Sequence, residues 1–250
     1  MPRILGRLVG RILILMPFRT TFLPLYVIMG VLIFLTATGY FATLFSQYGV
    51  PYAVAGFLAF NVSLLSLALS PVNVVVKERV RKVAVPEMDV VYVLGIPYYI
   101  PRIRVMEDKS VTAINLGGAV IPVLISLALL SVLAGRLAEF FVVLFLTTLV
   151  SYISAKPVRG VGIVMSPVIP PIASLVASLV LFAGHYYLIP AVAYASSVLG
   201  SLIGADLMHL REMEETNPPV LSIGGAGTFD GIFVSGLLSL FFAYFLMLFL

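Results

Sequence analysis

Two carboxylates are the strongest candidates for chemistry in this chain of 250 residues. Asp206 lies near the end of one apolar run, and Asp230 lies at the start of another, after a glycine-rich stretch that begins at Ser222. Two carboxyl groups about 3 Å apart cannot both ionise, so they share one proton. One could then act as general base on a water molecule and the other as general acid on a peptide carbonyl. The pair therefore predicts aspartyl protease chemistry, which needs neither a metal nor a cofactor.

Glycines accompany both acids. Gly204 lies two residues before Asp206, and three more glycines lie shortly before Asp230. Because glycine has no Cβ, an extended substrate backbone could approach each acid closely. We therefore expect these residues to bind substrate or shape the site: Gly204, Gly224, Gly225, Gly227, Asn115, Gly117, Gly118 and Lys156.

The composition indicates which elements must hold these residues. The chain is 61% hydrophobic and 10% charged, with a mean hydropathy of +1.15, whereas soluble domains carry roughly 25% charged residues. Too few polar residues remain to cover such an apolar core, so we expect its solvent to be lipid. Nucleic acid is not an expected partner. The absence of cysteine excludes disulfides, thiolate metal sites and cysteine nucleophiles.

Seven apolar stretches predict seven transmembrane helices in an all-α, multi-pass protein of the cell membrane. The expected spans are 22–45, 51–70, 111–133, 140–155, 172–184, 188–207 and 229–250. The third span should be kinked or broken, because Asn115-Leu-Gly-Gly118 and Pro122 interrupt its first half. The few asparagines and glutamines fit an archaeal or thermophilic source as well as they fit a membrane protein.

The basic residues orient these spans. Seven spans with a cytoplasmic N-terminus place fourteen of the fifteen Lys and Arg residues inside and leave only Arg136 outside. Because Lys and Arg concentrate on the cytoplasmic side, we expect an N-in/C-out topology. Asp206 and Asp230 then lie at similar depth near the cytoplasmic face, on consecutive antiparallel helices.

The N-terminal segment, residues 1–21, carries Arg3, Arg7 and Arg11 at a spacing of four. This spacing places the arginines on one helical face and apolar residues on the other. It predicts a basic amphipathic helix that lies on a leaflet with anionic lipid headgroups.

Two other segments are expected outside regular spans. Residues 71–110 are charged and rich in β-branched residues, which predicts a small cytoplasmic β insert between residues 22–70 and 111–250. Residues 156–171 are apolar but rich in proline and glycine, so they could form a re-entrant segment. Pro170 and Pro171 could also extend the fifth span backwards as first-turn residues.

Simpler interpretations of the two acids remain open. Asp230 could stabilise the N-terminus of the last helix, beside a Thr228 cap. Asp206 could be held by a basic partner such as Lys156 or Arg159. Both interpretations leave the acids structural.

A metal site and a transport function are further alternatives. His209, three residues after Asp206, could join the two acids in a metal site. Proton- or sodium-coupled transport would also use broken helices and buried acids. Coupling sites usually lie near the midplane, whereas both acids are expected near one face, so the depth favours the protease.

The glycines before Asp230 resemble the Gly-x-Gly-Asp motif of intramembrane aspartyl proteases, the group of presenilin, signal peptide peptidase and prepilin peptidase. In this chain the run is Gly225-Ala-Gly227-Thr-Phe-Asp230, with two residues between glycine and acid, and no Pro-Ala-Leu motif follows. The resemblance implies that Asp206 and Asp230 are catalytic and that the substrate is a transmembrane peptide or protein.

The chain is also similar, over about residues 73–233, to a prokaryotic family of integral membrane proteins known as domain-of-unknown-function family 1614. The residues that carry the similarity are 115–122 (NLGGAVIP), 156–163 (KPVRGVGI), 202–207 (LIGADL) and 222–233 (SIGGAGTFDGIF). The resemblance implies a membrane protein and no particular activity.

Overall fold

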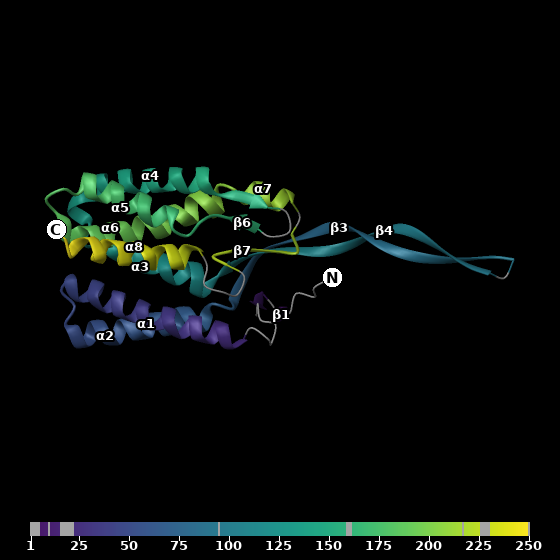
Figure 1. Cartoon of the computed structure of the whole chain (residues 1–250), viewed down its shortest axis with the longest axis horizontal. Helices are drawn as coiled ribbons and strands as arrows, with labels where there is room; N and C mark the ends of the chain where they lie inside the picture. Colours follow the sequence, from purple (N-terminus) through teal and green to yellow (C-terminus); the bar gives the residue numbers. More distant parts are fainter. Residues whose placement is uncertain are drawn as a thin grey trace.

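The computed structural model describes residues 6–9, 11–15, 23–94, 96–158, 162–216, 218–225 and 231–249. Within these residues the chain is mostly helical and also builds a sizeable β sheet (Figure 1). The α-helices are α1 (Leu23–Gln47), α2 (Tyr52–Leu69), α3 (Ile121–Leu129), α4 (Leu137–Ser154), α5 (Ile169–Leu181), α6 (Ile189–Ser201), α7 (Leu210–Glu215) and α8 (Gly231–Met247). The strands are β1 (Gly6–Val9), β2 (Ile12–Leu15), β3 (Val72–Val93), β4 (Ile96–Asn115), β5 (Lys156–Val158), β6 (Gly162–Val164) and β7 (Val220–Ile223).

In the described part of the chain, four helical segments are long and apolar enough to cross a membrane. They are Pro24–Gln47, Tyr52–Leu69, Ala134–Ser154 and Tyr186–Leu207. Three shorter apolar helices accompany them: Leu116–Leu129, Ile169–Leu181 and Gly231–Met247. These helices lie side by side in one bundle, and successive members run in opposite directions (Figure 1).

Helix α6 lies at the centre of the bundle. Its membrane-length segment is 83% buried, whereas each of the other three long segments is only 22% buried. Small side chains allow this, because they let neighbouring backbones approach closely. A Cβ on Gly200 would lie 2.8 Å from the Thr147 side chain of α4, and a Cβ on Gly236 of α8 would lie 2.7 Å from Val198. Helix α6 is therefore in close contact with both α4 and α8.

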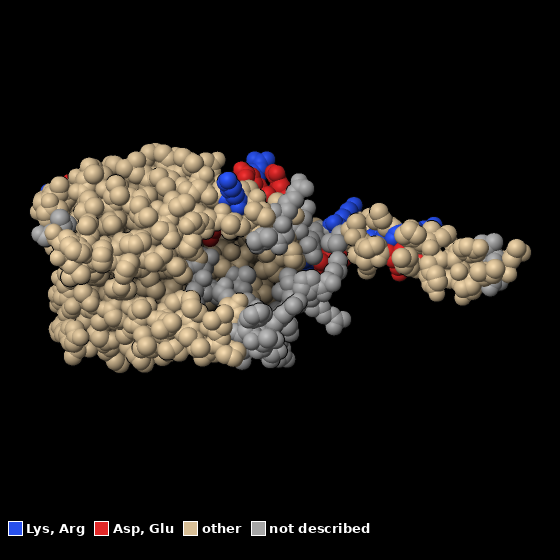
Figure 2. Space-filling view, viewed as in Figure 1, with Lys and Arg blue, Asp and Glu red and all other residues tan. Residues whose placement is uncertain are grey.

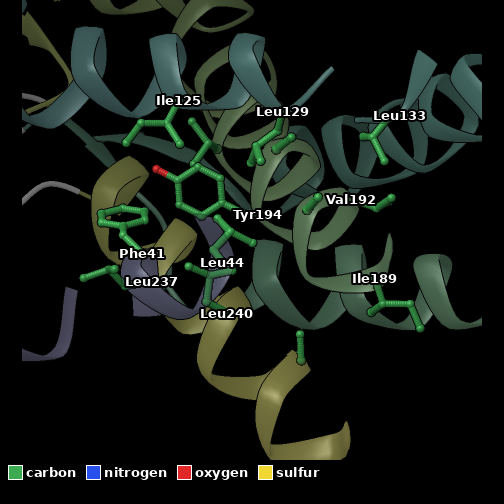
Figure 3. Packing of buried hydrophobic residues seen from close by; sticks show 14 of the residues in the cluster. Phe41, Leu44, Ile125, Leu129, Leu133, Ile189, Val192, Tyr194, Leu237 and Leu240 are labelled. Atoms are coloured by element: carbon green, nitrogen blue, oxygen red, sulfur yellow. The ribbon is translucent and has the colours of Figure 1, made fainter. Parts of the chain in front are cut away.

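Tyr194 is the largest fully buried side chain of the core around α6. The ring of Phe41 from α1 meets it edge-on, with the centroids 5.6 Å apart. Ile125, Leu44 and Leu237 lie around the same ring (Figure 3). Helices α1, α3, α6 and α8 therefore share one apolar core.

The main sheet has the strand order β1-β2-β3-β4-β7. Its largest part is the antiparallel hairpin of β3 and β4, called here the arm, which projects beyond the helices along their axes (Figure 1). Strand β2 pairs with residues 72–74 only, and β7 pairs in parallel with residues 111–114 only. Within the described residues the rest of the arm is therefore a two-stranded ribbon.

This sheet corrects the prediction of an all-α protein. The β insert is present, but its second strand runs to Asn115 and takes the first five residues of the expected span 111–133. Helix begins only at Leu116, as the π-helical turn η2 (Leu116–Val120), and becomes regular at Ile121. The prediction of an irregular first half is confirmed.

The prediction of an N-terminal amphipathic helix is also wrong for the described residues, which form strands β1 and β2. The base of the arm offers backbone partners at this point. Leu15 donates its N–H to the Pro71 carbonyl at 2.9 Å, and Val75 donates to the Arg11 carbonyl at 2.8 Å. Pairing with another segment has overridden the local helical spacing.

Residues 156–171 contain a short hairpin, β5 and β6, followed by the start of α5 at Ile169. Pro170 and Pro171 lie in the first turn of α5, where their missing N–H groups cost no hydrogen bond. The expected backward extension of this helix is confirmed.

Candidate functional site

Asp206 lies on the π-helical turn η5 (Leu202–Leu207), which continues α6 at the end of the bundle that carries the arm (Figure 1). Its Oδ2 accepts the backbone N–H of Gly224 at 3.3 Å. Gly224 follows β7 and opens the glycine-rich stretch before Asp230. Asp206 therefore connects the end of α6 to the beginning of that stretch.

The second candidate acid, Asp230, lies outside the described residues, as does Gly227. Helix α8 begins at the next residue, Gly231. The contacts between α6 and α8 therefore show how the start of α8 lies relative to Asp206.

Helices α6 and α8 touch through serine side chains one to two turns from these ends. The Oγ atoms of Ser201 and Ser235 are 3.1 Å apart, and Ser197 Oγ donates to the Ser235 carbonyl at 3.2 Å. Asp206 follows Ser201 by five residues, and Gly231 precedes Ser235 by four. The end of η5 and the start of α8 therefore lie on the same side of the serine contact.

Gly224 and Gly225 have backbone conformations that side chains disfavour, with φ of 82° and 96°. A Cβ on Gly224 would lie 2.3 Å from the Cβ of Ala119 in η2. Gly224 therefore fits between η2 and Asp206, and the two π-helical turns approach each other through it.

Gly204 and Gly117 shape the site through close packing. A Cβ on Gly204 would lie 2.3 Å from the Thr148 carbonyl oxygen of α4, and a Cβ on Gly117 would lie 2.1 Å from the Ser66 carbonyl oxygen of α2. The backbone of this chain therefore fills the space beside both glycines. At Gly204 this is the space in which we expected a substrate backbone. The glycines instead draw η5 against α4 and η2 against α2.

His209 closes the end of η5. Its Nδ1 lies 3.0 Å from the Ala205 carbonyl oxygen and 3.2 Å from that of Gly204, and its ring stacks on Tyr152 with the centroids 4.7 Å apart. Such contacts satisfy carbonyl groups that a helix end leaves without partners. Among the described residues there is no group of three His, Cys, Asp or Glu side chains that could hold a metal ion.

Asn115 joins three elements at the base of the arm. Its Oδ1 accepts the N–H of Gly118 at 2.6 Å and so caps η2. Its Nδ2 donates to the Ser70 carbonyl at 2.6 Å and to Asn73 Oδ1 at 3.2 Å. Asn115 is fully buried, so these bonds fix the point where the arm enters the bundle.

Asn73 and Ser222 extend this network to the glycine-rich stretch. Ser222 Oγ lies 2.6 Å from Asn73 Oδ1 and also contacts the Gly225 carbonyl oxygen. Sequence reasoning did not select Asn73, although it is one of few amides in the chain. Its role depends on the pairing of β3 with β4, which places Asn73 opposite Asn115.

Lys156, the remaining candidate, is an exposed residue at the start of β5. Arg159, the other proposed basic partner of Asp206, lies outside the described residues. Asp206 contacts the backbone of Gly224.

A polar pocket of about 550 Å³ opens beside the end of η5. Its walls come from β3, η5 and α7, and consist of Lys77, Arg79, Leu207, Leu210, Arg211, Glu214 and Glu215. Glu214 forms ion pairs with Arg79 and, at 3.1 Å, with Lys77. Figure 2 shows charged side chains gathered here and along the arm, while the visible face of the helices is almost free of them.

Comparisons with known proteins identify a family and no characterised relative. Neither the curated proteins nor the solved structures contain a match to this chain. A family model described as "Protein of unknown function (DUF1614)" matches residues 67–242, which include the arm, both π-helical turns and most of α8. This match covers well over half of the chain, and the protein therefore belongs to the DUF1614 family.

Proposed function

We propose that this protein is a membrane-embedded peptide hydrolase in which Asp206 and Asp230 form a proton-sharing pair. The contact between Ser201 and Ser235 is the observation that carries the proposal. At a rise of about 1.5 Å per residue, five residues carry Asp206 about 7.5 Å beyond this contact. Asp230 precedes Ser235 of the antiparallel helix α8 by five residues in the sequence, and we propose that it lies on the same side of the contact.

The hydrogen bond between Asp206 and Gly224 supports the same pairing. It holds Gly224 at the first acid, and the contact of α8 with α6 holds Gly231 at the same end of the bundle. Six residues connect Gly224 to Asp230, a distance of at most about 20 Å even when fully extended. We therefore propose that both carboxylates lie at the same end of the bundle.

The proposed reaction needs only the two acids and a water molecule. The ionised acid takes a proton from water as the oxygen attacks the peptide carbon, and the protonated acid donates to the carbonyl oxygen. Collapse of the resulting diol breaks the C–N bond, and a proton passes to the leaving amine. The proposed substrate is a transmembrane peptide or protein that enters from the bilayer.

We further propose that all seven apolar helices cross the cell membrane, with the arm on the cytoplasmic side and the C-terminus outside. The alternating direction of the helices supports seven crossings, although three of them are short. The distribution of Lys and Arg supports the orientation. Basic residues near this end would contact anionic lipid headgroups.

Cleavage of a transmembrane peptide by the purified protein in liposomes tests the hydrolase. Asp206→Asn and Asp230→Asn should each lower the rate by about 10²- to 10⁴-fold or more, the usual contribution of a general acid or base. Glu215→Gln is the control, because Glu215 is exposed and pairs only loosely with Arg211, at 3.6 Å. Cleavage at the wild-type rate in either aspartate variant would contradict the proposal.

Proton- or sodium-coupled transport is a second candidate, favoured by the two π-helical turns that meet at Gly224. Interrupted helices of this kind often surround the ion sites of transporters. Liposomes with a pH-sensitive dye and a panel of solutes discriminate the two functions. Solute-driven proton or sodium flux that Asp206→Asn abolishes, without peptide cleavage, would establish transport instead.

A further inference from the structure

The outer part of the arm has one face without any charge. In an antiparallel pair, directly opposed residues lie on the same face. The pairing register therefore places ten apolar residues on this face, called here the apolar face of the arm: Ala84, Pro86, Met88, Val90, Tyr92, Pro97, Tyr99, Pro101, Ile103 and Val105. Such a continuous apolar surface marks an interaction site.

The apolar face is open to solvent. Met88 is 65% exposed, Tyr92 70%, Tyr99 69% and Ile103 77%. An isolated two-stranded ribbon is at best marginally stable in water. A partner that covers this face would therefore stabilise the arm as well as bind to it.

The opposite face of the outer arm carries its charges, and these are paired. Arg102 lies 2.9 Å from Asp89, and Arg104 lies 3.3 Å from Glu87. Nearer the base, on the same face as the apolar residues, Lys109 lies 3.5 Å from Glu78. Because these pairs lie within one arm, two arms could approach without strong charge repulsion.

The edges of the outer arm are poorly suited to strand addition. Three prolines, Pro86 on β3 and Pro97 and Pro101 on β4, lie on the apolar face. Proline has no N–H, so these residues can only occupy pairs without cross-strand hydrogen bonds, where the N–H of any other residue would point to the open edge. The β3 edge therefore lacks one donor, and the β4 edge two, that an added strand would need, so we expect a partner to cover the face.

The apolar face lies too far from the helices to be covered by the membrane that holds them. At about 3.3 Å per residue, Ala84 and Val105 lie roughly 30 Å beyond the base of the arm at Val75 and Ala113. The arm continues along the helix axes (Figure 1), and its tip carries no charge on the face shown in Figure 2. A partner of this face must therefore lie outside the bilayer.

We propose that this partner is a second copy of the same chain, which packs its apolar face against the first. Two copies in one membrane project their arms to the same height. A two-fold axis along the membrane normal then brings identical faces together in matching register. The apolar face carries no charge, so it fits a partner surface without charges. The arm of a second copy supplies such a surface.

Cross-linking in the native membrane tests this dimer, because the chain has no cysteine of its own. Packed sheets lie about 10 Å apart, so a short bismaleimide should link Tyr99→Cys of one copy to Tyr99→Cys of the other. Tyr98→Cys is the matched control, since Tyr98 is the neighbouring residue, is 53% exposed and lies on the opposite face. We expect several-fold more cross-linked dimer from Tyr99→Cys.

A second variant separates the dimer from an effect on folding. Ile103→Glu places a charge on the apolar face and should convert the purified dimer to a monomer by light scattering. Ile100→Glu places the same charge on the opposite face and should leave the dimer intact. Equal cross-linking at positions 98 and 99, a monomeric wild type, or a different protein bound stoichiometrically to the apolar face would each overturn the proposal. Peptide cleavage is not used as a readout, so this test does not depend on the proposed function.

Discussion

At the residue scale, Asn115 is the side chain on which the geometry of the site depends most directly. It serves the arm, η2 and the end of α2 with one amide. Asn115→Ala would leave the Gly118 N–H and the Ser70 carbonyl without this partner. Each buried polar group left unsatisfied costs about 1–3 kcal/mol. We therefore expect a clearly lower midpoint of thermal unfolding for the purified protein in detergent.

Asn61→Ala is the control for this prediction. Asn61 lies within α2, and its Nδ2 donates to the Phe57 carbonyl of its own helix at 2.7 Å. Its loss should change the free energy of unfolding by no more than about 0.5 kcal/mol. Equal shifts in the two variants would contradict the role given to Asn115.

Sequence reasoning at this scale placed Asp206 correctly at the end of an apolar helix. It also selected Asn115 and the glycines at positions 117, 204 and 224 as site-shaping residues. It could not show that the space beside Gly204 is filled by Thr148, because spacing along one helix does not reveal which helix lies opposite. The same limit hid Asn73 and its contact with Ser222, because the two residues belong to separate elements.

At the scale of elements, the close approach of η5 to α4 decides how Asp206 is held. Gly204→Ala would place a Cβ 2.3 Å from a backbone oxygen that cannot rotate away. Overpacking of this kind costs about 1–3 kcal/mol. We expect a lower unfolding midpoint, together with faster hydrogen exchange in η5 as it separates from α4.

Gly56→Ala is also a glycine-to-alanine substitution, but we expect it not to lower the stability. Gly56 lies inside α2, and a Cβ there has no neighbour within 4 Å. Alanine in a helix interior is favoured over glycine by up to about 1 kcal/mol. The variant should be as stable as the wild type or more stable, and a loss of stability in Gly56→Ala similar to that in Gly204→Ala would refute the packing argument.

The elements differ in how far their sequences specify them. Regular apolar helices such as α1 and α4 follow directly from long uncharged runs, and the arm follows from its β-branched, charged strands. Strands β1 and β2 do not, because Arg3, Arg7 and Arg11 repeat at a helical spacing. Their conformation is set by unpaired backbone groups at the base of the arm, which no local pattern encodes.

At the scale of the whole molecule, hydropathy identified seven apolar segments, and each contains an apolar helix in the structure. What hydropathy could not provide is how many of them cross the bilayer. Helices of 13 residues, such as α5, are shorter than a typical span of about 20 residues. Connectivity argues for a crossing, because α5 joins segments at opposite ends of the bundle (Figure 1).

Single cysteines test this topology without removing any native thiol, since the chain has none. A maleimide that cannot cross membranes should label Ala134→Cys and Tyr186→Cys in intact cells. It should label Leu94→Cys, Ser166→Cys and Glu215→Cys only after permeabilisation. These sites alternate along the chain between the two ends of the bundle, so each change of side reports one crossing.

The comparison of Ser166→Cys with Tyr186→Cys is decisive for α5, because only this helix separates the two positions. Labelling of both from the same side would mean that α5 does not cross, and six spans or fewer would remain. Labelling of Leu94→Cys in intact cells, with Ala134→Cys protected, would preserve the number of crossings but reverse the orientation. In that case the arm and Asp206 would face the exterior, and a cytoplasmic substrate could not reach the proposed pair.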